Sequence, residues 1–365
     1  MNRLEACLLL HCLPGLGWQR SLKMSDHFGS PEAIFLHSKK EWDHVEGVGL
    51  VVCNVLSQWK QYFPKVQIQI QLIKKYGITP LFFGSVNYPK PLTFCADAPL
   101  VLFTKGKLAI ENRPILSVIG TRQYTPYGKS FCESLIKAVA PYDPIICSGL
   151  ARVIDIIAHR ETLKQGLDTV ACLAHGLDQI YPPEHRTEAN KIMKQGLLVT
   201  DFLPQTVFLK GNFPRRNRLI AGMAIATVVI ESGIKGGSMN TANLAHSYGR
   251  ELFAVPGRTT DIKSMGCHEL IVQQKAQLLS DPYQLIETLG WNTNEKQLPV
   301  QQKLFISLTS EEQKIIDLFN SHPKLHLDEL ALKLEKKVGP LSGLMLQLEM
   351  KGAIRALPGK YFERI

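Results

Sequence analysis

Short runs of apolar residues alternate with helix-like stretches through the middle of the chain. Continuous apolar runs are expected where a strand is buried on both faces of a sheet. Helix-like stretches such as Leu150–Leu163 and Thr241–Tyr248 lie between them. The alternation predicts an α/β fold with a Rossmann-like, doubly wound parallel sheet. The predicted strands are Leu100–Phe103, Ile115–Ile119, Pro144–Cys147, Thr169–Leu173, Leu197–Thr200, Ala226–Ile230, Glu251–Val255 and a weaker one at Gln277–Leu279.

The first 80 residues have a helical pattern and contain two similar hairpins, Leu13–Gly17 and Val45–Gly49. Each has an apolar residue between two glycines, as in helix-hairpin-helix and SAM-like modules. Glycine lets exposed backbone amides at a helix start approach a phosphate closely. Purely structural helical modules contain such pairs too, so phosphate contact by this region stays open.

The C-terminal part of the chain begins with a polar stretch that we interpret as a linker. Three short helices are predicted after it, at Ser310–Phe319, Leu327–Leu334 and about Pro340–Lys351. Two strands around the turn at Pro358 and Gly359 complete the order of a winged helix, a module that binds DNA or other proteins. The predicted domains are therefore 1–80 (helical), 81–290 (Rossmann-like), 291–309 (linker) and 310–365 (winged-helix-like).

The charge and cysteine content narrow the class of protein. The formal net charge of +10 favours an anionic partner, either nucleic acid or an acidic membrane surface. The eight cysteines form no C-x-x-C pair and several lie in apolar strands, which is typical of reduced thiols in a reducing compartment. Residues 6–13 are interpreted as a first helix rather than an export signal, and no apolar run reaches the length of a membrane span. A cytoplasmic protein without membrane association is expected.

Four glycine-containing loops follow predicted strands. In an open parallel sheet, ligands bind where the carboxyl ends of strands lead into helix starts. Glycine permits close backbone approach there, and free amides together with the helix dipole attract an anion. One such loop is routine turn chemistry, whereas several on one edge favour a binding site. The loops are Gly120-Thr121-Arg122, Ser148-Gly149, Gly236-Gly237-Ser238 and Pro256-Gly257-Arg258.

The segment Lys210–Gly222 is the strongest single candidate for binding an anion. It contains Phe213, Arg215, Arg216, Asn217 and Arg218, and no acidic residue lies between positions 201 and 231. Guanidinium groups suit bidentate phosphate contact, and Phe213 is able to stack on an unpaired base. The alternative is a solvated loop whose arginines pair with distant carboxylates.

Enzymatic interpretations have less support. The chain lacks a G-x-G-x-x-G motif after a strand and a P-loop, so no cofactor is expected. Asp155 and His159 lie four residues apart and could form an acid–base or metal pair, but such a pair is more often a helix hydrogen bond. The other histidines lack metal-ligand spacing, and Ser148 is not in a nucleophile elbow. We therefore expect a binding protein with no metal and no catalytic residue.

Together, these segments resemble the DprA/Smf family of DNA-processing proteins. The resemblance spans about residues 115–280 in the family's order, and the flanking regions agree with its common architecture. It rests on Ser117–Gly128, Ser148–His159, Thr169–Pro182, Phe213–Gly222, Lys235–Gly257 and Gly266–Ile271.

The resemblance implies a dimer that binds single-stranded DNA, shields it during natural transformation and loads the RecA recombinase for homologous recombination. Gly120, Thr121 and Arg122 match the family's Gly-Ser/Thr-Arg motif, which contacts DNA. The segment 215–218 matches its basic pocket, and Lys235–Ser238 matches its glycine–serine loop.

Four positions depart from the family pattern. Val153 and Ala174 stand where glycine is usual or common, Gly236 replaces a frequent serine, and Lys275 replaces a glycine. None of these removes a cation from the proposed pocket. Val153 does put close ligand approach at its turn in doubt.

The expected mechanism is phosphate pairing by Arg122, Arg215 and Arg218, with further donors from the amides of the 120–122, 148–149 and 236–238 loops. Bases would be held by shape and stacking, with little sequence preference. Two alternatives remain: a nucleotide hydrolase of the phosphoribohydrolase type, whose P-G-G-x-G-T motif is replaced here by Lys235–Asn240, and an interaction scaffold that docks through its C-terminal module.

Overall fold

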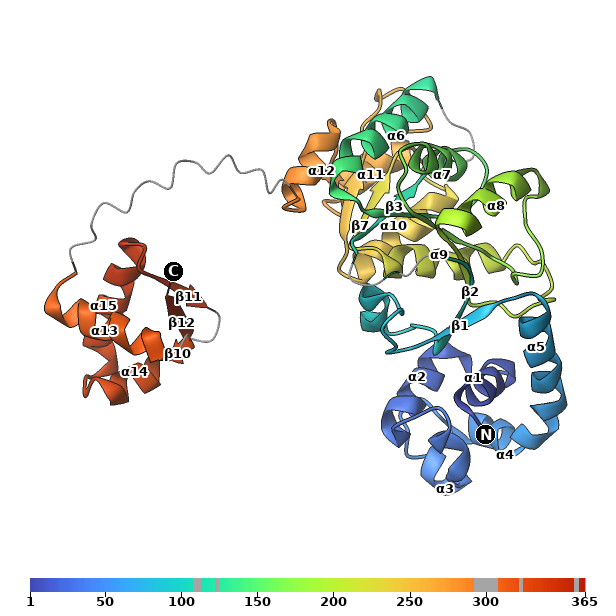
Figure 1. Ribbon diagram of the computed structural model, residues 1–365, viewed down its shortest axis with the longest axis horizontal. Coiled ribbons are helices and arrows are strands. Elements are labelled where there is room, and N and C mark those ends of the chain that lie inside the picture. The colour runs from blue at the N-terminus through green and yellow to red at the C-terminus, as the bar shows by residue number, and fades with distance from the viewer. Residues whose placement is uncertain are drawn as a thin grey trace. The chain divides into compact units, whose positions relative to one another are not determined.

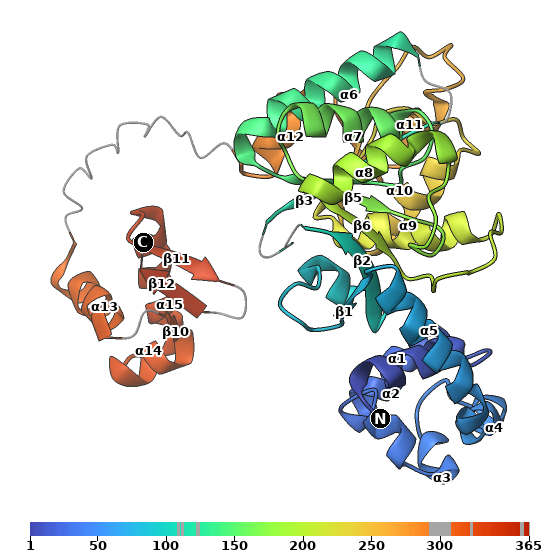
Figure 2. The same ribbon diagram turned by 45° about the vertical axis from the view of Figure 1, so that its right-hand side comes forward.

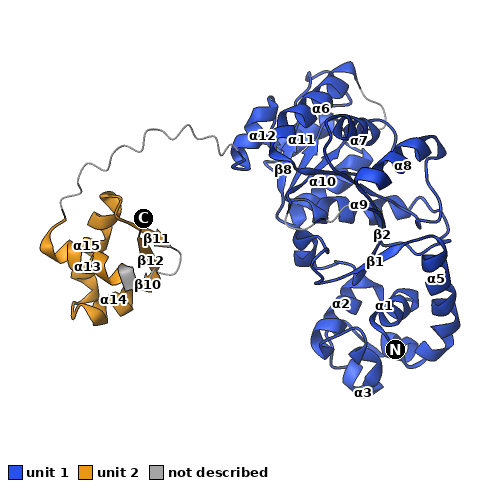
Figure 3. Cartoon of the chain, in the orientation of Figure 1, with its two compact units in different colours: residues 1–291 blue, residues 292–365 orange. Residues whose placement is uncertain are grey.

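The computed structural model forms two compact units, residues 1–291 and 292–365 (Figure 3). It describes residues 1–107, 110, 113–121, 125–291, 308–321, 324–357 and 361–364. The predicted linker falls largely on residues 292–307, which lie outside the described residues, as do Arg122 and the predicted turn at Pro358 and Gly359.

The first unit begins with a bundle of short helices that lies beyond strands β1 and β2 of its sheet (Figure 1). Asn2 and Glu5 form a capping box that starts the first helix, and its residues 6–10 are buried. The helices are α1 (Arg3–Cys12), α2 (Gly17–Phe28), η1 (Ala33–Leu36), α3 (Lys39–Trp42), α4 (Leu50–Ser57), η2 (Trp59–Tyr62) and α5 (Phe63–Lys75).

The side chain of Arg20 joins the two glycine hairpins of this bundle. Its Nε donates to the carbonyl of Gly47 at 2.8 Å, and its Nη1 donates to the carbonyl of Gly15 at 2.5 Å. Both glycines have positive φ, 74° at Gly15 and 82° at Gly47, which a side chain would disfavour. The hairpins are thus packed as a pair.

The sheet of this unit has nine strands within the described residues, in the order β1-β2-β6-β5-β4-β3-β7-β8-β9. From β6 to β9 in this order, neighbouring strands are parallel. Strand β2 pairs antiparallel with β6 on one side and with β1 on the other. The bounds are β1 (Thr79–Phe82), β2 (Val101–Gly106), β3 (Ile115–Ile119), β4 (Ile145–Ser148), β5 (Thr169–Cys172), β6 (Leu197–Thr200), β7 (Ala226–Val229), β8 (Glu251–Ala254) and β9 (Gln277–Leu278).

Strand β3 lies at the centre of the parallel part. Its residue Leu116 is paired with Ile146 of β4 on one side and with Ala226 of β7 on the other. The chain winds outward from β3 in one direction through β4, β5 and β6, and then returns to continue from β7 in the other direction. The crevice between β3 and β7 is therefore the topological switch point, where open α/β sheets bind ligands.

Helices cover both faces of the sheet (Figure 2). One face carries α6 (Pro126–Val139), α7 (Ile154–Lys164), α8 (Arg186–Gln195) and α12 (Pro282–Thr288). The other carries α9 (Asn212–Met223) and α10 (Gly237–Ser247). Shorter elements are η3 (Lys90–Phe94), η4 (Ala140–Tyr142), η5 (Pro183–His185) and α11 (Met265–Val272). The predicted Rossmann-like sheet is confirmed.

Local differences from the prediction follow from backbone conformation. Strand β1 was not predicted. Helix α7 begins at Ile154 rather than at residue 150, because Leu150 and Val153 have positive φ of 54° and 81°. Helix α10 begins at Gly237, before the expected start at Thr241, so its first turn includes part of the glycine loop.

The second unit has its own apolar core, formed by residues such as Ile315, Leu330, Leu341 and Leu348. Its sheet has the order β10-β12-β11 and is antiparallel. Three helices and a following strand pair occur as predicted for a winged helix, with β10 as an unpredicted addition. The elements are α13 (Ser310–Ser321), β10 (Lys324–His326), α14 (Leu327–Lys333), α15 (Val338–Met350), β11 (Ile354–Leu357) and β12 (Tyr361–Arg364).

Candidate nucleic-acid interface

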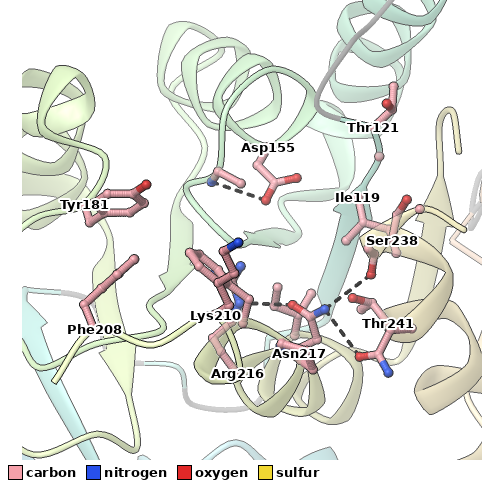
Figure 4. Close-up of a pocket in the computed structure, with 18 residues that line it drawn as sticks. Ile119, Thr121, Asp155, Tyr181, Phe208, Lys210, Arg216, Asn217, Ser238 and Thr241 are labelled. Carbon is pink, nitrogen blue, oxygen red and sulfur yellow. Dashed lines mark hydrogen bonds between the residues drawn. The ribbon is translucent and has the colours of Figure 1, made fainter. Parts of the chain in front are cut away.

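A cavity of about 880 Å³ opens at the switch point, where the loops after β3, β4 and β7 meet the start of α9 (Figure 4). The structure brings eight of the predicted site residues to its wall: Gly120, Thr121, Phe213, Arg216, Asn217, Gly236, Gly237 and Ser238. Among the lining residues, all of which the structure describes, the cations are Lys210 and Arg216.

The loop after β3 is held by Glu231, which follows β7. The carbonyl of Glu231 accepts from the amide of Thr121 at 2.7 Å. Its carboxylate accepts from the amide of Thr125 at 2.9 Å and from the Thr125 hydroxyl. The side chain of Glu231 is 1% exposed, so this carboxylate serves the loop rather than solvent. Sequence reasoning missed this role, although an acid directly after a buried strand was a visible signal.

Glycine at position 120 is required by packing. A Cβ at this position would lie 2.7 to 2.9 Å from side-chain atoms of Ile154, at the start of α7. The loop after β3 therefore lies directly on the start of the neighbouring helix. This close approach places the backbone of Gly120 and Thr121 at the cavity wall.

Asp155, in the first turn of α7, organises the loop after β4. Its Oδ2 accepts from the amides of Gly149 at 3.1 Å and Ala151 at 3.4 Å. Burial raises the pKa of this carboxyl, although the nearby Arg216 acts in the opposite direction. Asp155 lines the cavity, whereas Ser148 does not. The hydroxyl of Ser148 donates to the carbonyl of Val118 at 2.7 Å and is fully buried, so this side chain holds the loop, and the contact predicted for the backbone amides of the loop stays a prediction.

The basic segment forms the first turns of α9 rather than a loop before a helix. The guanidinium of Arg216 is 4% exposed and donates to the carbonyls of Gly149, at 2.5 Å, and Cys172. A Cβ at Gly149 would overlap Arg216, which explains the glycine. Asn217 reaches across to α10, with its Nδ2 3.4 Å from both the carbonyl of Gly237 and Oδ1 of Asn240. Arg216 therefore contributes a largely buried positive charge to the cavity wall.

The prediction that Arg218 pairs with phosphate is wrong. Its side chain is 8% exposed and forms an ion pair with Asp201, which is itself fully buried, and it also donates to the carbonyl of Asp97. Arg215 is exposed, but it does not line the cavity; its guanidinium lies 4.8 Å from the centroid of the Phe202 ring. The expected cluster of three arginines at the site is thus reduced, and Arg122 lies outside the described residues.

An aromatic wall bounds the cavity on the side away from Thr121 and Ser238 (Figure 4). It consists of Tyr181, Phe208 and Phe213. The ring centroid of Phe208 lies 4.2 Å from that of Tyr181 and 5.4 Å from that of Phe213. Tyr181 and Phe208 are 43% and 36% exposed, which leaves part of each ring open to a ligand. Neither residue was singled out from the sequence.

A smaller cavity of about 210 Å³ adjoins the first and shares Ala151, Tyr181, Phe213 and Arg216 with it. His175 forms part of it. The Nε2 of His175 accepts from the amide of Tyr181 at 3.2 Å, and its Nδ1 donates to the carbonyl of Gly176 at 2.8 Å. Burial lowers the pKa of His175, so the ring contributes hydrogen bonds rather than charge.

The start of α10 forms the opposite wall. Gly236 is its N-cap, and Gly237 and Ser238 are in its first turn. The hydroxyl of Ser238 donates to that of Ser232 at 2.8 Å. Lys235 is exposed and does not line the cavity. The dipole at this end of the helix favours an anion.

Other candidate chemistry does not assemble within the described residues. His159 is fully buried and bonds through Nδ1 to the hydroxyl of Thr169 at 2.7 Å, and burial lowers its pKa to about 3. No group of three or more His, Cys, Asp or Glu side chains in the described part of the chain is arranged to hold a metal ion. The described helices are too short or too polar to span a membrane.

Comparisons with known proteins agree with these features. The family model for DNA recombination-mediator protein A matches residues 79–290, and the DprA winged helix domain matches residues 305–360. The chain is 30% identical over 360 residues to Protein Smf of Escherichia coli, covering 94% of each. It is 34% identical over 231 residues to the DNA processing protein DprA of Bacillus subtilis, covering 63% of this chain and 77% of that protein.

Two solved structures are also similar. The structure of DprA from Streptococcus pneumoniae superimposes with a TM-score of 0.67 at 30% identity, covering 79% of this chain and 98% of that chain. A structure that describes the single-stranded DNA binding mode of DprA from Helicobacter pylori gives a TM-score of 0.53 at 30% identity, covering 59% of this chain and 96% of that chain.

Proposed function

The chain belongs to the DprA/Smf family of DNA-processing proteins, and we propose that it binds single-stranded DNA in the cavity at the switch point of its sheet. The observation that carries this proposal is the combination of anion-binding backbone on one wall with partly exposed aromatic rings on the other. A polynucleotide whose bases are unpaired presents both phosphates and open ring faces, and duplex DNA hides the latter.

The phosphate side of the cavity is formed by the start of α10, and the loop of Gly120 and Thr121 lies beside it, with the amide of Thr121 bonded to the carbonyl of Glu231. Lys210 is exposed at the cavity and supplies a cation there. Arg216 adds positive charge from a fixed, buried position. These groups recognise the backbone of DNA without reading its sequence.

The base side is formed by Tyr181, Phe208 and Phe213. Stacking on aromatic rings tolerates every base, because each base has a π-face. Binding at this wall is therefore expected to show little sequence preference.

Three further cations belong to the proposal: Arg215 and Lys235, which do not line the cavity, and Arg122, which lies outside the described residues. Arg122 follows Thr121 directly in the sequence, and Lys235 precedes the N-cap of α10. Arg215 is exposed on α9, the helix that provides Phe213. We assign to all three contacts with phosphates of the bound strand. Arg218 has no part in this assignment.

The wider role follows the family. The protein would shield single strands during natural transformation and load the RecA recombinase onto them for homologous recombination, as a homodimer without an enzymatic step. A dimer offers two cavities to one strand, and the second contact then forms at a high effective concentration.

The experiment is a fluorescence anisotropy titration of a labelled single strand with the full chain and with Lys210→Ala and Arg122→Glu. Each variant is expected to bind several-fold more weakly. Lys137→Ala, an exposed lysine of α6 outside the cavity lining, is the matched control and should bind as the unmodified chain does. Normal binding by both site variants would overturn the assignment of the cavity.

One observation favours a second candidate function, nucleotide hydrolysis. Asp155 is a buried carboxyl with a raised pKa that lines the cavity, and such groups often take part in proton transfer. Incubation with nucleoside monophosphates tests it: release of free base that is lost in Asp155→Asn would support hydrolysis. No release would leave Asp155 with its role in holding the loop after β4.

A further inference from the structure

Helix α15 of the C-terminal unit has two distinct faces. Leu341, Met345 and Leu348 are buried in the core of the unit. On the opposite face, Gly339, Gly343, Leu346 and Met350 recur at intervals of four, three and four residues and so form a continuous stripe. Leu346 is 57% exposed and Met350 is 82% exposed. This spacing is that of a helix–helix packing seam, and the seam has no partner within the described unit.

The stripe has the wrong chemistry for duplex DNA. All four of its residues are uncharged, whereas a helix that reads DNA presents cations to phosphates and bases. Residues 310–365 are also nearly balanced in charge, with eight acidic and nine basic residues, although the whole chain has a net charge of +10. The acidic ones are Glu311, Glu312, Asp317, Asp328, Glu329, Glu335, Glu349 and Glu363, and the basic ones are Lys314, Lys324, Lys333, Lys336, Lys337, Lys351, Arg355, Lys360 and Arg364.

The stripe is complementary in shape to the same stripe of a second copy whose helix runs in the opposite direction. Its first half is made of glycines, and its second half is made of the large side chains Leu346 and Met350. Glycine allows another helix to approach closely. In an antiparallel pair of helices, Met350 of one copy faces Gly339 of the other, and Leu346 faces Gly343. Each projection then meets a recess, as a twofold interface requires.

The charges at the two ends of α15 agree with the same arrangement. Lys337 is the exposed N-cap, and Glu349 lies in the last turn, where its Oε1 accepts from the amide of Ala356 at 3.2 Å. Each charge lies at the helix end where the dipole disfavours it, the cation at the N-terminus and the anion at the C-terminus. An antiparallel second helix brings the negative end of its dipole beside the first turn of α15 and the positive end beside the last turn, which offsets both charges.

We propose that this face of α15 is a contact between two copies of the chain, formed by antiparallel pairing of their α15 helices. It is separate from the proposed binding of single-stranded DNA and involves none of the residues assigned to the cavity. The two C-terminal units of a dimer would thereby be joined to each other.

Disulfide cross-linking of the full chain tests the pairing and its direction. Gly339→Cys and Met350→Cys are prepared as separate variants and oxidised alone and as a mixture. Eleven residues of helix span about 16 Å, so in an antiparallel pair neither variant can bridge to itself, because a disulfide needs its two Cα atoms within roughly 7 Å. The mixture is expected to give a covalent dimer at least fivefold faster than either variant alone. The unmodified chain, with its eight free cysteines, gives the background.

The result has clear alternatives. No excess cross-linking in the mixture overturns the proposal, and equal cross-linking by each variant alone overturns the antiparallel direction. Leu346→Glu, added to both cysteine variants, should abolish the cross-link, whereas Leu332→Glu, at an 81% exposed leucine of α14, should not. If Leu346→Glu instead lowers affinity for duplex DNA and the mixture fails to cross-link, the face binds DNA and the proposal is wrong. Binding of single strands by Leu346→Glu should be unchanged, which separates this test from that of the cavity.

Discussion

The carboxylate of Glu231 accepts hydrogen bonds from both the amide and the hydroxyl of Thr125, the N-cap of α6. The carbonyl of Glu231 also accepts from the amide of Thr121. Glu231, which follows β7, thus holds both described ends of the loop that contains the Gly-Thr-Arg motif. These hydrogen bonds join the loop after β3 to the loop after β7 without a ligand.

Replacing Glu231 by glutamine should weaken binding of single strands. The amide keeps the shape but loses the charge and one of two acceptor oxygens, and hydrogen bonds to a charged group are worth about 1.5–3 kcal/mol. We expect the affinity to fall about tenfold while circular dichroism shows a folded protein. Glu133→Gln, a half-buried acid on the same α6, is the matched control. Unchanged affinity in Glu231→Gln would mean that the loop does not need this anchor.

Replacing Arg218 by methionine should affect stability and not DNA binding. The change leaves the fully buried Asp201 without its guanidinium partner, and breaking a buried pair in this way costs about 3–5 kcal/mol. Urea unfolding measures the loss. At a concentration of urea where the variant remains folded, its affinity for a single strand should match that of the unmodified chain. A large loss of affinity with unchanged stability would return Arg218 to the DNA site.

Asp201 should make the stability depend on pH in acid. Burial alone raises the pKa of Asp201, but Arg218, Arg215 and His11 outweigh burial, so the pKa is lowered below its usual value. A lowered pKa in the folded state stabilises the protein above the unfolded pKa of about 4, and this contribution is lost as the pH falls below that value. Urea unfolding between pH 6 and pH 3 should therefore show a smaller decrease in Asp201→Asn than in the unmodified chain. Parallel curves would show that Asp201 makes no such contribution.

Phe208 should contribute to binding through its exposed ring. Base–aromatic stacking is worth about 1–3 kcal/mol per base, so Phe208→Ala is expected to weaken binding of a single strand by roughly fivefold to a hundredfold. Phe94→Ala removes a ring that is 75% exposed but lies in η3, outside the cavity lining, and should have no effect. Equal affinities of these two variants would argue against the aromatic wall.

The fold and the place of the site could be predicted because their signals are local. Buried parallel strands are continuous apolar runs, and the glycine loops at their carboxyl ends indicate the switch point from the sequence alone. Gly120 and Gly149 do lie where side chains of Ile154 and Arg216 leave no room for a Cβ. Such close contacts are the physical reason that glycines after predicted strands indicate where loops and helix starts meet.

The direction of the arginine side chains could not be predicted in the same way. Arg218 pairs with Asp201, which comes 17 positions earlier in the sequence, directly after β6. An absence of acids inside a segment says nothing about acids that the fold brings to it. Arg215, Arg216 and Arg218 are neighbours in sequence, yet a helix directs them to different surroundings.

Backbone strain was also invisible in the sequence. Val153 has a φ of 81° and a ψ of −106°, a conformation that a β-branched residue rarely adopts. Glycine adopts such a conformation readily, so the turn has a shape typical of glycine in spite of the Val153 side chain. The doubt that Val153 raised concerned ligand approach, and Ala151, two residues earlier, does line the cavity.

The most direct measurement compares affinity for a single strand and for a duplex of the same sequence over a range of salt concentrations. We predict that the single strand binds more tightly, and that the logarithm of its association constant falls with the logarithm of salt with a slope of about 3.5, as phosphate contacts by the five assigned cations require. Lys210→Ala should lower this slope by about 0.7. Equal affinity for the duplex, or a response that does not depend on salt, would contradict a cavity that binds an unpaired strand through its phosphates.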